Sequence, residues 1–244
     1  MSESTRVAIV TGASGGIGRA AAERLAQDGL AVVVGYSGNA VRAEETVSTI
    51  TAAGGTASAF GADVADEADV AALFDHADAR YGGIDVVVNA AGIMLLKPLV
   101  EIDFADFDRM LRINVRGAFI VTQLAARRIR VGGAIINVST TVTRLASPTY
   151  SAYAATKGAV DAATLIFAKE MRGRDVTVNA VAPGPTATPL FFDGKSQQVI
   201  DTIAAAAPLG RLGVPTDIAE VVSFLAGPGR WVNGQVIYTN GGLA

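Results

Sequence analysis

Residues 6–19 read Arg-Val-Ala-Ile-Val-Thr-Gly-Ala-Ser-Gly-Gly-Ile-Gly-Arg, a short apolar run that passes directly into a glycine-rich turn and then into a helical pattern. In such a turn one glycine permits a tight bend, a second lets a pyrophosphate approach the backbone, and a third lets the helix pack on the strand. The helix N-terminus adds free N–H groups and the positive end of its dipole. The stretch therefore predicts the first strand, phosphate loop and first helix of a dinucleotide-binding unit.

The spacing of these glycines differs from the plain G-x-G-x-x-G form. Here it is G-x-x-x-G-x-G, and the lysine of a nucleoside triphosphate-binding P-loop is absent, which argues against triphosphate hydrolysis. The residues expected to surround a dinucleotide pyrophosphate are Gly12, Ser14, Gly15, Gly16, Ile17 and Gly18.

Short runs rich in Val and Ile alternate with longer helical patterns along most of the chain, as in βαβ units. The runs are continuously apolar, which is typical of parallel strands covered on both faces. The expected strands are 6–11, 31–36, 56–62, 84–89, 133–139, 176–181 and 235–238, and the expected helices are 17–28, 40–53, 67–81, 104–130, 151–172 and 216–225. We predict one α/β domain over residues 1–244, a doubly wound parallel sheet of about seven strands with helices on both faces.

The alternation is interrupted between Pro183 and Pro208 by four prolines and by the pair Phe191 and Phe192. Insertions of this kind often cover a binding site. We expect a loop with one or two short helices, and we expect it to cover the substrate at about residues 185–208.

Composition excludes several classes of protein. With 50% hydrophobic and 18% charged residues, the chain of 244 residues is folded rather than disordered. It has no cysteine and His76 is its single histidine, so we expect neither disulfides, nor a metal site, nor a Ser-His-Asp triad. A net charge of −3 without a basic stripe argues against nucleic acid, and no apolar run reaches the roughly 18 residues of a membrane span. The polar start from Met1 to Arg6 does not resemble a signal peptide, and we expect a cytoplasmic protein.

The end of the second expected strand bears on the choice between NAD and NADP. An acidic residue there would bind the ribose of NAD and repel a 2′-phosphate, but the chain reads Gly-Tyr-Ser-Gly-Asn at 35–39. Side chains near this point can donate hydrogen bonds to a phosphate, and they are Ser14, Tyr36, Ser37 and Asn39, with Arg42 close in sequence. Asn39 also suits the N-cap of the next helix. The segment favours NADP(H) over NAD(H).

Tyr153 and Lys157 stand four residues apart at the start of an expected helix, so they share one face of it. Taken alone, such a pair is common on helix surfaces. Its significance comes from polar and glycine-rich segments that follow other strands, where ligands bind in open α/β sheets. These segments are Asn89-Ala90-Ala91-Gly92, Ser139-Thr140 and Pro183-Gly184, and Asn114 lies in the helix between two of the strands.

The chain resembles a classical short-chain dehydrogenase/reductase, because the glycine loop, Asn-Ala-Ala-Gly, Tyr-x-x-x-Lys and Pro-Gly occur in the order and spacing of that family. Within it, the Gly-Tyr-Ser-Gly-Asn segment is similar to the β-ketoacyl reductase and trihydroxynaphthalene reductase branches, whose members mostly use NADPH. The resemblance implies a Rossmann-type fold and a ketoreductase. Gly15 departs from the arginine that NADP-dependent relatives often carry.

The resemblance implies a role for each member of a catalytic group. Tyr153 would act as general acid toward a carbonyl, Lys157 would favour the phenolate and hold the nicotinamide ribose, and Asn114 would anchor a water. The family has a serine 13 residues before the tyrosine, where this chain has Thr140. Strand alternation points Ser139 and Thr140 to opposite faces. We expect Thr140 to fill the role, with Ser139 as the alternative.

Other expected contacts follow the same motifs. The resemblance assigns to the cofactor Asp63, Val64, Asn89, Ala90, Ala91, Gly92, Pro183, Gly184, Thr186 and Thr188. Asp63 is equally suited to cap the following helix. Apolar residues in the expected loops suggest a ketone or alcohol substrate with apolar flanks, namely Met94, Leu95, Leu96, Leu145, Tyr150, Phe191 and Phe192.

Two alternatives stay open at this point. A non-catalytic dinucleotide-binding regulator would keep the glycine loop but has no need of Tyr153 with Lys157. A sugar-nucleotide epimerase usually carries a longer substrate domain than this chain can hold. By analogy with the family we expect a homotetramer or a homodimer.

Overall fold

The computed structural model describes residues 5–244, and the first four residues of the polar start lie outside them. Seven parallel strands form one sheet in the order β3-β2-β1-β4-β5-β6-β7, which confirms the predicted doubly wound sheet. The strands are β1 (Val7–Thr11), β2 (Ala31–Tyr36), β3 (Thr56–Gly61), β4 (Val86–Asn89), β5 (Ala134–Val138), β6 (Thr177–Pro183) and β7 (Val236–Thr239).

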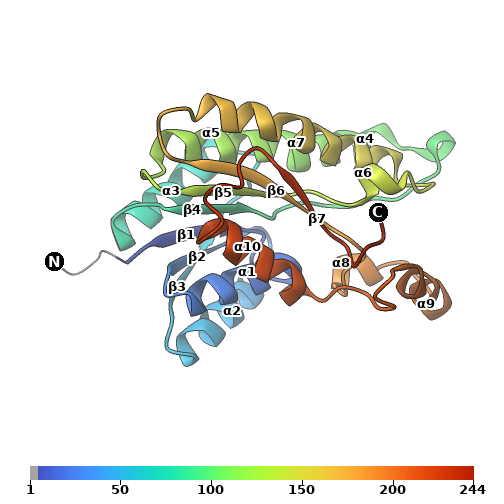
Figure 1. The fold of residues 1–244 in the computed structure, drawn as a ribbon, viewed down its shortest axis with the longest axis horizontal. Helices are drawn as coiled ribbons and strands as arrows, with labels where there is room; N and C mark the ends of the chain where they lie inside the picture. The colour runs from blue at the N-terminus through green and yellow to red at the C-terminus, as the bar shows by residue number, and fades with distance from the viewer. Residues whose placement is uncertain (1–4) are drawn as a thin grey trace.

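Helices cover both faces of the sheet, as Figure 1 shows. One layer consists of α1 (Gly16–Gln27), α2 (Ala40–Ala52) and α10 (Pro215–Ala226), and the other of α3 (Glu67–Tyr81), α5 (Ala118–Arg128) and α7 (Ser151–Glu170). The central strands are buried along their length because apolar side chains alternate between these two layers. Leu25 fills the first layer and Phe74 the second, and neither is exposed to solvent.

Local signals account for most helix boundaries. Asn39 caps α2 and accepts a hydrogen bond from the Arg42 N–H, and Asp66 caps α3 through two such bonds. Gly82 ends α3 in the left-handed conformation.

The helix expected over residues 104–130 is continuous only to Arg128 and is not α-helical throughout. It consists of α4 (Phe104–Met110), a π-helical segment η2 (Leu111–Gly117) and α5. The sequence also gave no indication of two short helices, the 3₁₀ turn η1 (Leu99–Glu101) and α6 (Val142–Leu145). Within residues 5–244, no helix is both long and apolar enough to cross a membrane.

The insertion between β6 and α10 contains two short helices, α8 (Pro189–Phe192) and α9 (Gln197–Ala206), in agreement with the expected loop. Figure 1 places them beyond the C-terminal ends of the strands. At the same edge the strand order reverses between β1 and β4, which opens a crevice where open α/β sheets bind ligands.

Candidate active site

A cavity of about 610 Å³ lies at the C-terminal edge of the sheet. It brings together nearly all of the residues singled out from the sequence. The lining residues among them are Gly12, Ser14, Gly15, Gly16, Ile17, Gly18, Tyr36, Ser37, Asn39, Asp63, Val64, Ala90, Ala91, Gly92, Ser139, Thr140, Tyr153, Lys157, Pro183, Gly184, Thr186 and Thr188. Two others, Asn89 and Asn114, are buried beneath the wall of the cavity.

The phosphate loop has no room for larger side chains at two positions. Gly12 has a φ of +66°, and a Cβ on it would lie 2.9 Å from the backbone of Ala91. A Cβ on Gly18 would collide with the carbonyl of Gly12, so this glycine lets α1 pack against the end of β1. Helix α1 begins after Gly15 with no side-chain cap, which leaves the N–H groups of its first turn for an anionic ligand. The loop therefore fits a dinucleotide pyrophosphate.

The far end of the cavity is lined by Tyr36, Ser37, Asn39 and Arg42, at the end of β2 and the start of α2. Asn39 combines both roles considered from the sequence, because it caps α2 and also lines the cavity. These four side chains include hydroxyl and guanidinium donors and no carboxylate. The arrangement fits a phosphate group attached to a ribose.

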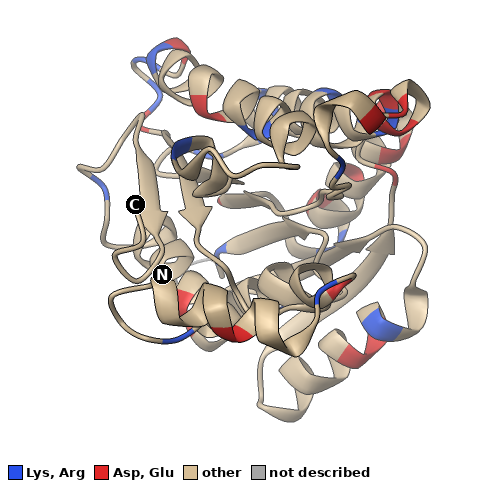
Figure 2. Ribbon diagram, turned by 90° about the vertical axis from the view of Figure 1, so that its right-hand side faces the viewer, with Lys and Arg blue, Asp and Glu red and all other residues tan. Residues whose placement is uncertain are grey.

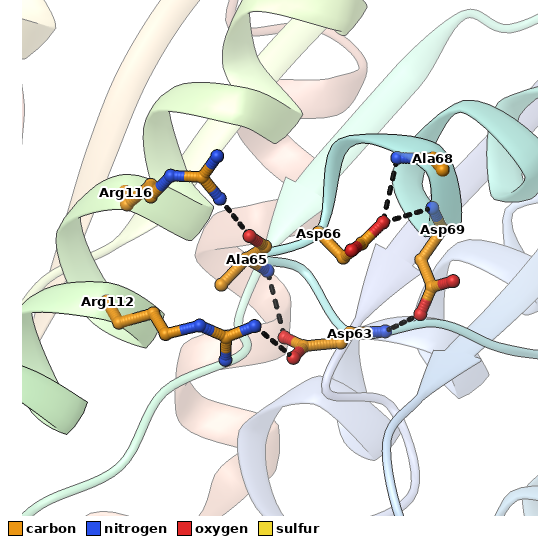
Figure 3. Close-up of polar contacts among 7 residues, drawn as sticks. All are labelled: Asp63, Ala65, Asp66, Ala68, Asp69, Arg112 and Arg116. Atoms are coloured by element: carbon orange, nitrogen blue, oxygen red, sulfur yellow. Dashed lines mark hydrogen bonds and ion pairs between the residues drawn. The ribbon is translucent and has the colours of Figure 1, made fainter.

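Asp63 lines the cavity and belongs to a network of polar contacts with Arg112 of the π-helical segment, which Figure 3 shows. Its carboxylate accepts from Arg112 Nη2 at 2.8 Å and from the Ala65 N–H at 2.9 Å. Burial opposes ionisation, but the Ala65 N–H and Arg112 outweigh it and lower the pKa of Asp63. The cap of α3 is Asp66, so Asp63 does not have the capping role that the sequence allowed. A contact between Asp63 and an adenine stays a prediction.

Tyr153 sits at the inner wall of the cavity with only 9% of its surface exposed. Its phenol lies next to the side chain of Thr140, which follows β5. Burial raises the pKa of Tyr153, the nearby Tyr150 raises it further, and the Thr140 hydroxyl lowers it only partly. The chain by itself therefore keeps the phenol protonated, which is the form that a general acid requires.

Lys157, one turn further along α7, is 5% exposed and donates from Nζ to the carbonyl of Val138 at 2.7 Å. Burial lowers the pKa of Lys157 to about 8, although Asp161 opposes the change. An ammonium with this pKa exchanges its proton in the working range of most enzymes.

Asn114 lies in the π-helical segment and is almost fully buried. Its amide group accepts from the Ile93 N–H at 2.9 Å and donates to the Ile93 carbonyl at 2.8 Å and to Thr156 Oγ1 at 3.1 Å. These bonds tie the loop after β4 to α7, directly behind Lys157. The water that the resemblance assigns to Asn114 stays a prediction.

Asn89 does not line the cavity, and Ser139 is not the hydroxyl that lies next to Tyr153. Asn89 accepts from Thr11 Oγ1 at 3.1 Å, and that hydroxyl accepts from the Ala91 N–H, so Asn89 supports the loop that lines the cavity. Ser139 does line the cavity, but among the described residues its Oγ is buried without a hydrogen-bond partner. The hydroxyl that meets Tyr153 is that of Thr140.

The remaining wall of the cavity is largely apolar. Of the residues suggested for a substrate pocket, Met94, Leu145, Tyr150 and Phe191 line it, whereas Leu95, Leu96 and Phe192 do not. Three further residues line the wall and were not predicted, namely Ile93, Val142 and Leu190. Val142 lies in α6 and Leu190 in α8, and these helices are too short to leave a periodic pattern in the sequence. Figure 2 views the molecule from this edge and shows most charged residues on the surrounding helices.

Comparisons with known proteins agree with this geometry. A family model described as enoyl-(acyl carrier protein) reductase matches residues 12–244. An NADPH-dependent aldehyde reductase-like protein from Arabidopsis thaliana is 42% identical, with 97% of this chain and 93% of the relative covered. A short-chain dehydrogenase/reductase structure from Serratia marcescens is 37% identical with a TM-score of 0.92, covering 98% of this chain and 97% of the other. The chain belongs to the short-chain dehydrogenase/reductase family.

A further solved structure, the angucycline C-6 ketoreductase LanV with bound NADP, has the same identity and TM-score and covers 98% of this chain and 96% of its own. The resemblance stated from the motifs is thereby confirmed, and this short-chain dehydrogenase/reductase is an oxidoreductase by family. A regulator without catalytic activity is not favoured, because the relatives are described as enzymes and the chain keeps both Tyr153 and Lys157.

Proposed function

We propose that the protein is an NADP(H)-dependent ketoreductase that converts a ketone to a secondary alcohol. The observation that carries the proposal is the position of the Thr140 side chain next to the buried phenol of Tyr153, in the wall of the cavity that also holds the phosphate loop. It places a proton donor and a second hydroxyl side by side, where one carbonyl oxygen can meet both.

The cofactor assignment rests on the fit of the cavity and on the relatives. The phosphate loop, the donors around Arg42 and the missing acid after β2 suit NADP(H), and both the Arabidopsis relative and LanV are named for this cofactor. When bound, NADPH supplies the hydride that goes to the carbonyl carbon. Tighter binding of NADH than of NADPH in a calorimetric titration would overturn this assignment.

The side chains of the chain itself handle the proton. Thr140 donates a hydrogen bond to the carbonyl oxygen, and Tyr153 transfers its phenolic proton to that oxygen as the alcohol forms. Lys157 then stabilises the phenolate that is left and holds the nicotinamide ribose hydroxyls. In the direction of oxidation the same phenolate removes a proton from the alcohol.

The substrate proposal follows from the cavity wall. The charged residues that line it are Arg42, Asp63 and Lys157, and the wall around Met94 and Phe191 has none. An uncharged ketone with apolar flanks suits such a surface.

The decisive variant is Tyr153→Phe, which removes only the phenolic hydroxyl. We expect NADPH oxidation to fall by a factor of about 10²–10⁴ with every ketone that the wild type reduces, while NADPH binding is retained. Tyr81→Phe is the matched control, because that phenol lies at the end of α3 and does not line the cavity, and it should keep its turnover. An active Tyr153→Phe variant would refute the proposal.

The oligomeric state and the cellular location of the protein are also proposals. Three exposed apolar side chains on α5 and α7, Phe119, Leu165 and Ile166, suit contact with a second copy, in keeping with the expected homotetramer or homodimer. Light scattering in solution tests this. A cytoplasmic location stays a prediction.

A further inference from the structure

Asp161 forms a row with the two proposed site residues of α7. Tyr153, Lys157 and Asp161 are spaced four apart, so all three lie on one face of the helix. Asp161 is half-buried, and among the described residues its Oδ1 is enclosed without a hydrogen-bond partner. A carboxylate in such a position is costly unless a charge or a donor lies close to it.

Polar groups from two other elements surround this carboxylate. Burial raises the pKa of Asp161, whereas Ser139, Thr143, Lys157 and Arg144 all lower it. Ser139 comes from the end of β5, and Thr143 and Arg144 come from α6. The guanidinium of Arg144 also lies over a ring of β7, 3.7 Å from its centroid.

The two hydroxyls after β5 thus face different groups. Thr140 meets Tyr153, and Ser139 faces Asp161, as the alternation of side chains along a strand requires. Ser139 Oγ is itself buried and has no hydrogen-bond partner within residues 5–244. The carboxylate therefore has polar side chains beside it where α7 meets β5 and α6.

The groups that face Lys157 come from three elements. The Val138 carbonyl of β5 accepts its hydrogen bond, and Tyr153 and Asp161 precede and follow it on α7. The Asn114 amide of the π-helical segment lies behind it, because a Cβ placed on Gly92 would be 3.2 Å from Asn114 Oδ1 and 3.5 Å from Lys157 Nζ. Of these groups, only Asp161 is a carboxylic acid.

We infer that Asp161 is a positioning residue that acts through Lys157: its carboxylate, one turn further along α7 and held between β5 and α6, keeps the buried ammonium protonated beside Tyr153. The consequence for turnover rests on the proposed function, but the spacing of the two charged groups on one helix face is a property of the folded chain. Removal of the charge should leave the lysine easier to deprotonate.

The test is a direct titration of Lys157 by NMR. The chain has only four lysines, so labelling of lysine side chains gives four signals, and a Lys157→Arg variant identifies the one of interest. In Asp161→Asn we expect the pKa of Lys157 to fall below the wild-type value, and Asp161→Glu should restore it. Glu170→Gln, which removes an exposed acid at the end of the same helix, should leave the titration unchanged.

A second variant covers the case in which Asp161→Asn does not fold. If Asp161→Asn does not fold, Asp161→Ala, whose side chain is smaller than the carboxylate, serves in the same titration with the same expected fall. An unchanged titration of Lys157 in a folded variant overturns the inference, whether or not the enzyme reduces ketones.

A second readout links the charge of Asp161 to catalysis. In Asp161→Asn, the alkaline limb of the kcat profile should move to lower pH because Lys157 loses its proton earlier, while NADPH affinity at pH 6 stays unchanged. A uniform loss of kcat at every pH would indicate a purely structural role and would also overturn the inference. Inactive wild-type protein would instead contradict the proposed function, and it would leave the NMR result standing.

Discussion

Replacement of Lys157 by methionine tests how much stability the buried ammonium costs the protein. Lys157 is 5% exposed, and burial lowers its pKa from 10.5 to about 8. One pKa unit corresponds to about 1.4 kcal/mol, so below pH 8 the protonated lysine destabilises the folded state by about 3 kcal/mol relative to a lysine in water.

The sign of this effect decides the expected pH dependence. The folded chain loses the proton near pH 8 and the unfolded chain near pH 10.5. The cost is therefore fully present below pH 8 and is relieved as the pH rises toward 10.5. Methionine has a similar length and no charge, so Lys157→Met removes this term. The lost hydrogen bond to the Val138 carbonyl costs about 1–3 kcal/mol at every pH below 8, which offsets part of the gain.

The assay is urea denaturation of the cofactor-free protein at pH 7 and at pH 10. Relative to wild type, the free energy of unfolding of Lys157→Met should be about 2 kcal/mol larger at pH 7 than at pH 10, which means that the variant gains stability at the lower pH. Lys169→Met, an exposed position on the same helix, is the control and should show little difference between the two pH values. Equal effects of Lys157→Met at both pH values would refute the reasoning from burial.

Three further predictions concern the hydroxyl, the cofactor and the core. Thr140→Val should lower kcat by a factor of about 10²–10³ in steady-state kinetics and Ser139→Ala far less, and equal losses would contradict the assignment of Thr140. Arg42→Ala should weaken NADPH binding about tenfold in calorimetry and leave NADH binding unchanged, since only NADPH carries a 2′-phosphate for Arg42 to contact. Phe74→Ala should lower the free energy of unfolding by about 3–5 kcal/mol in urea, because the ring is fully buried; a loss below 1 kcal/mol would mean that the layer repacks freely.

The fold could be predicted because its signals are local. Continuous apolar runs predicted all seven strands, and Gly-Gly or Asp-Gly pairs predicted the ends of the first three long helices. The π-helical segment around Asn114 could not be foreseen in the same way. Its side chain is bonded to Ile93 and Thr156, which are 21 and 42 residues away, and such tertiary contacts leave no pattern in the local sequence.

The candidate site was predictable where spacing on one element fixes it. Tyr153 and Lys157 share a helix face at four residues apart, and the count back from the tyrosine selected Thr140. What the count could not supply was the group that Ser139 faces, because Asp161 comes from a different element. The ion pair of Asp63 with Arg112 was missed for the same reason, since 49 residues separate the two.

The residues proposed for proton transfer lie on α7, whereas the residues that would contact the substrate lie mostly elsewhere. Helical geometry sets the spacing of Tyr153, Lys157 and Asp161, and a rigid element holds side chains more accurately than a loop does. The substrate wall, in contrast, comes mostly from short segments such as α6 and α8. Substitutions in those segments should change which ketone is reduced, because they leave the row on α7 intact. Substitutions within the row should change the rate and its pH dependence for every ketone alike.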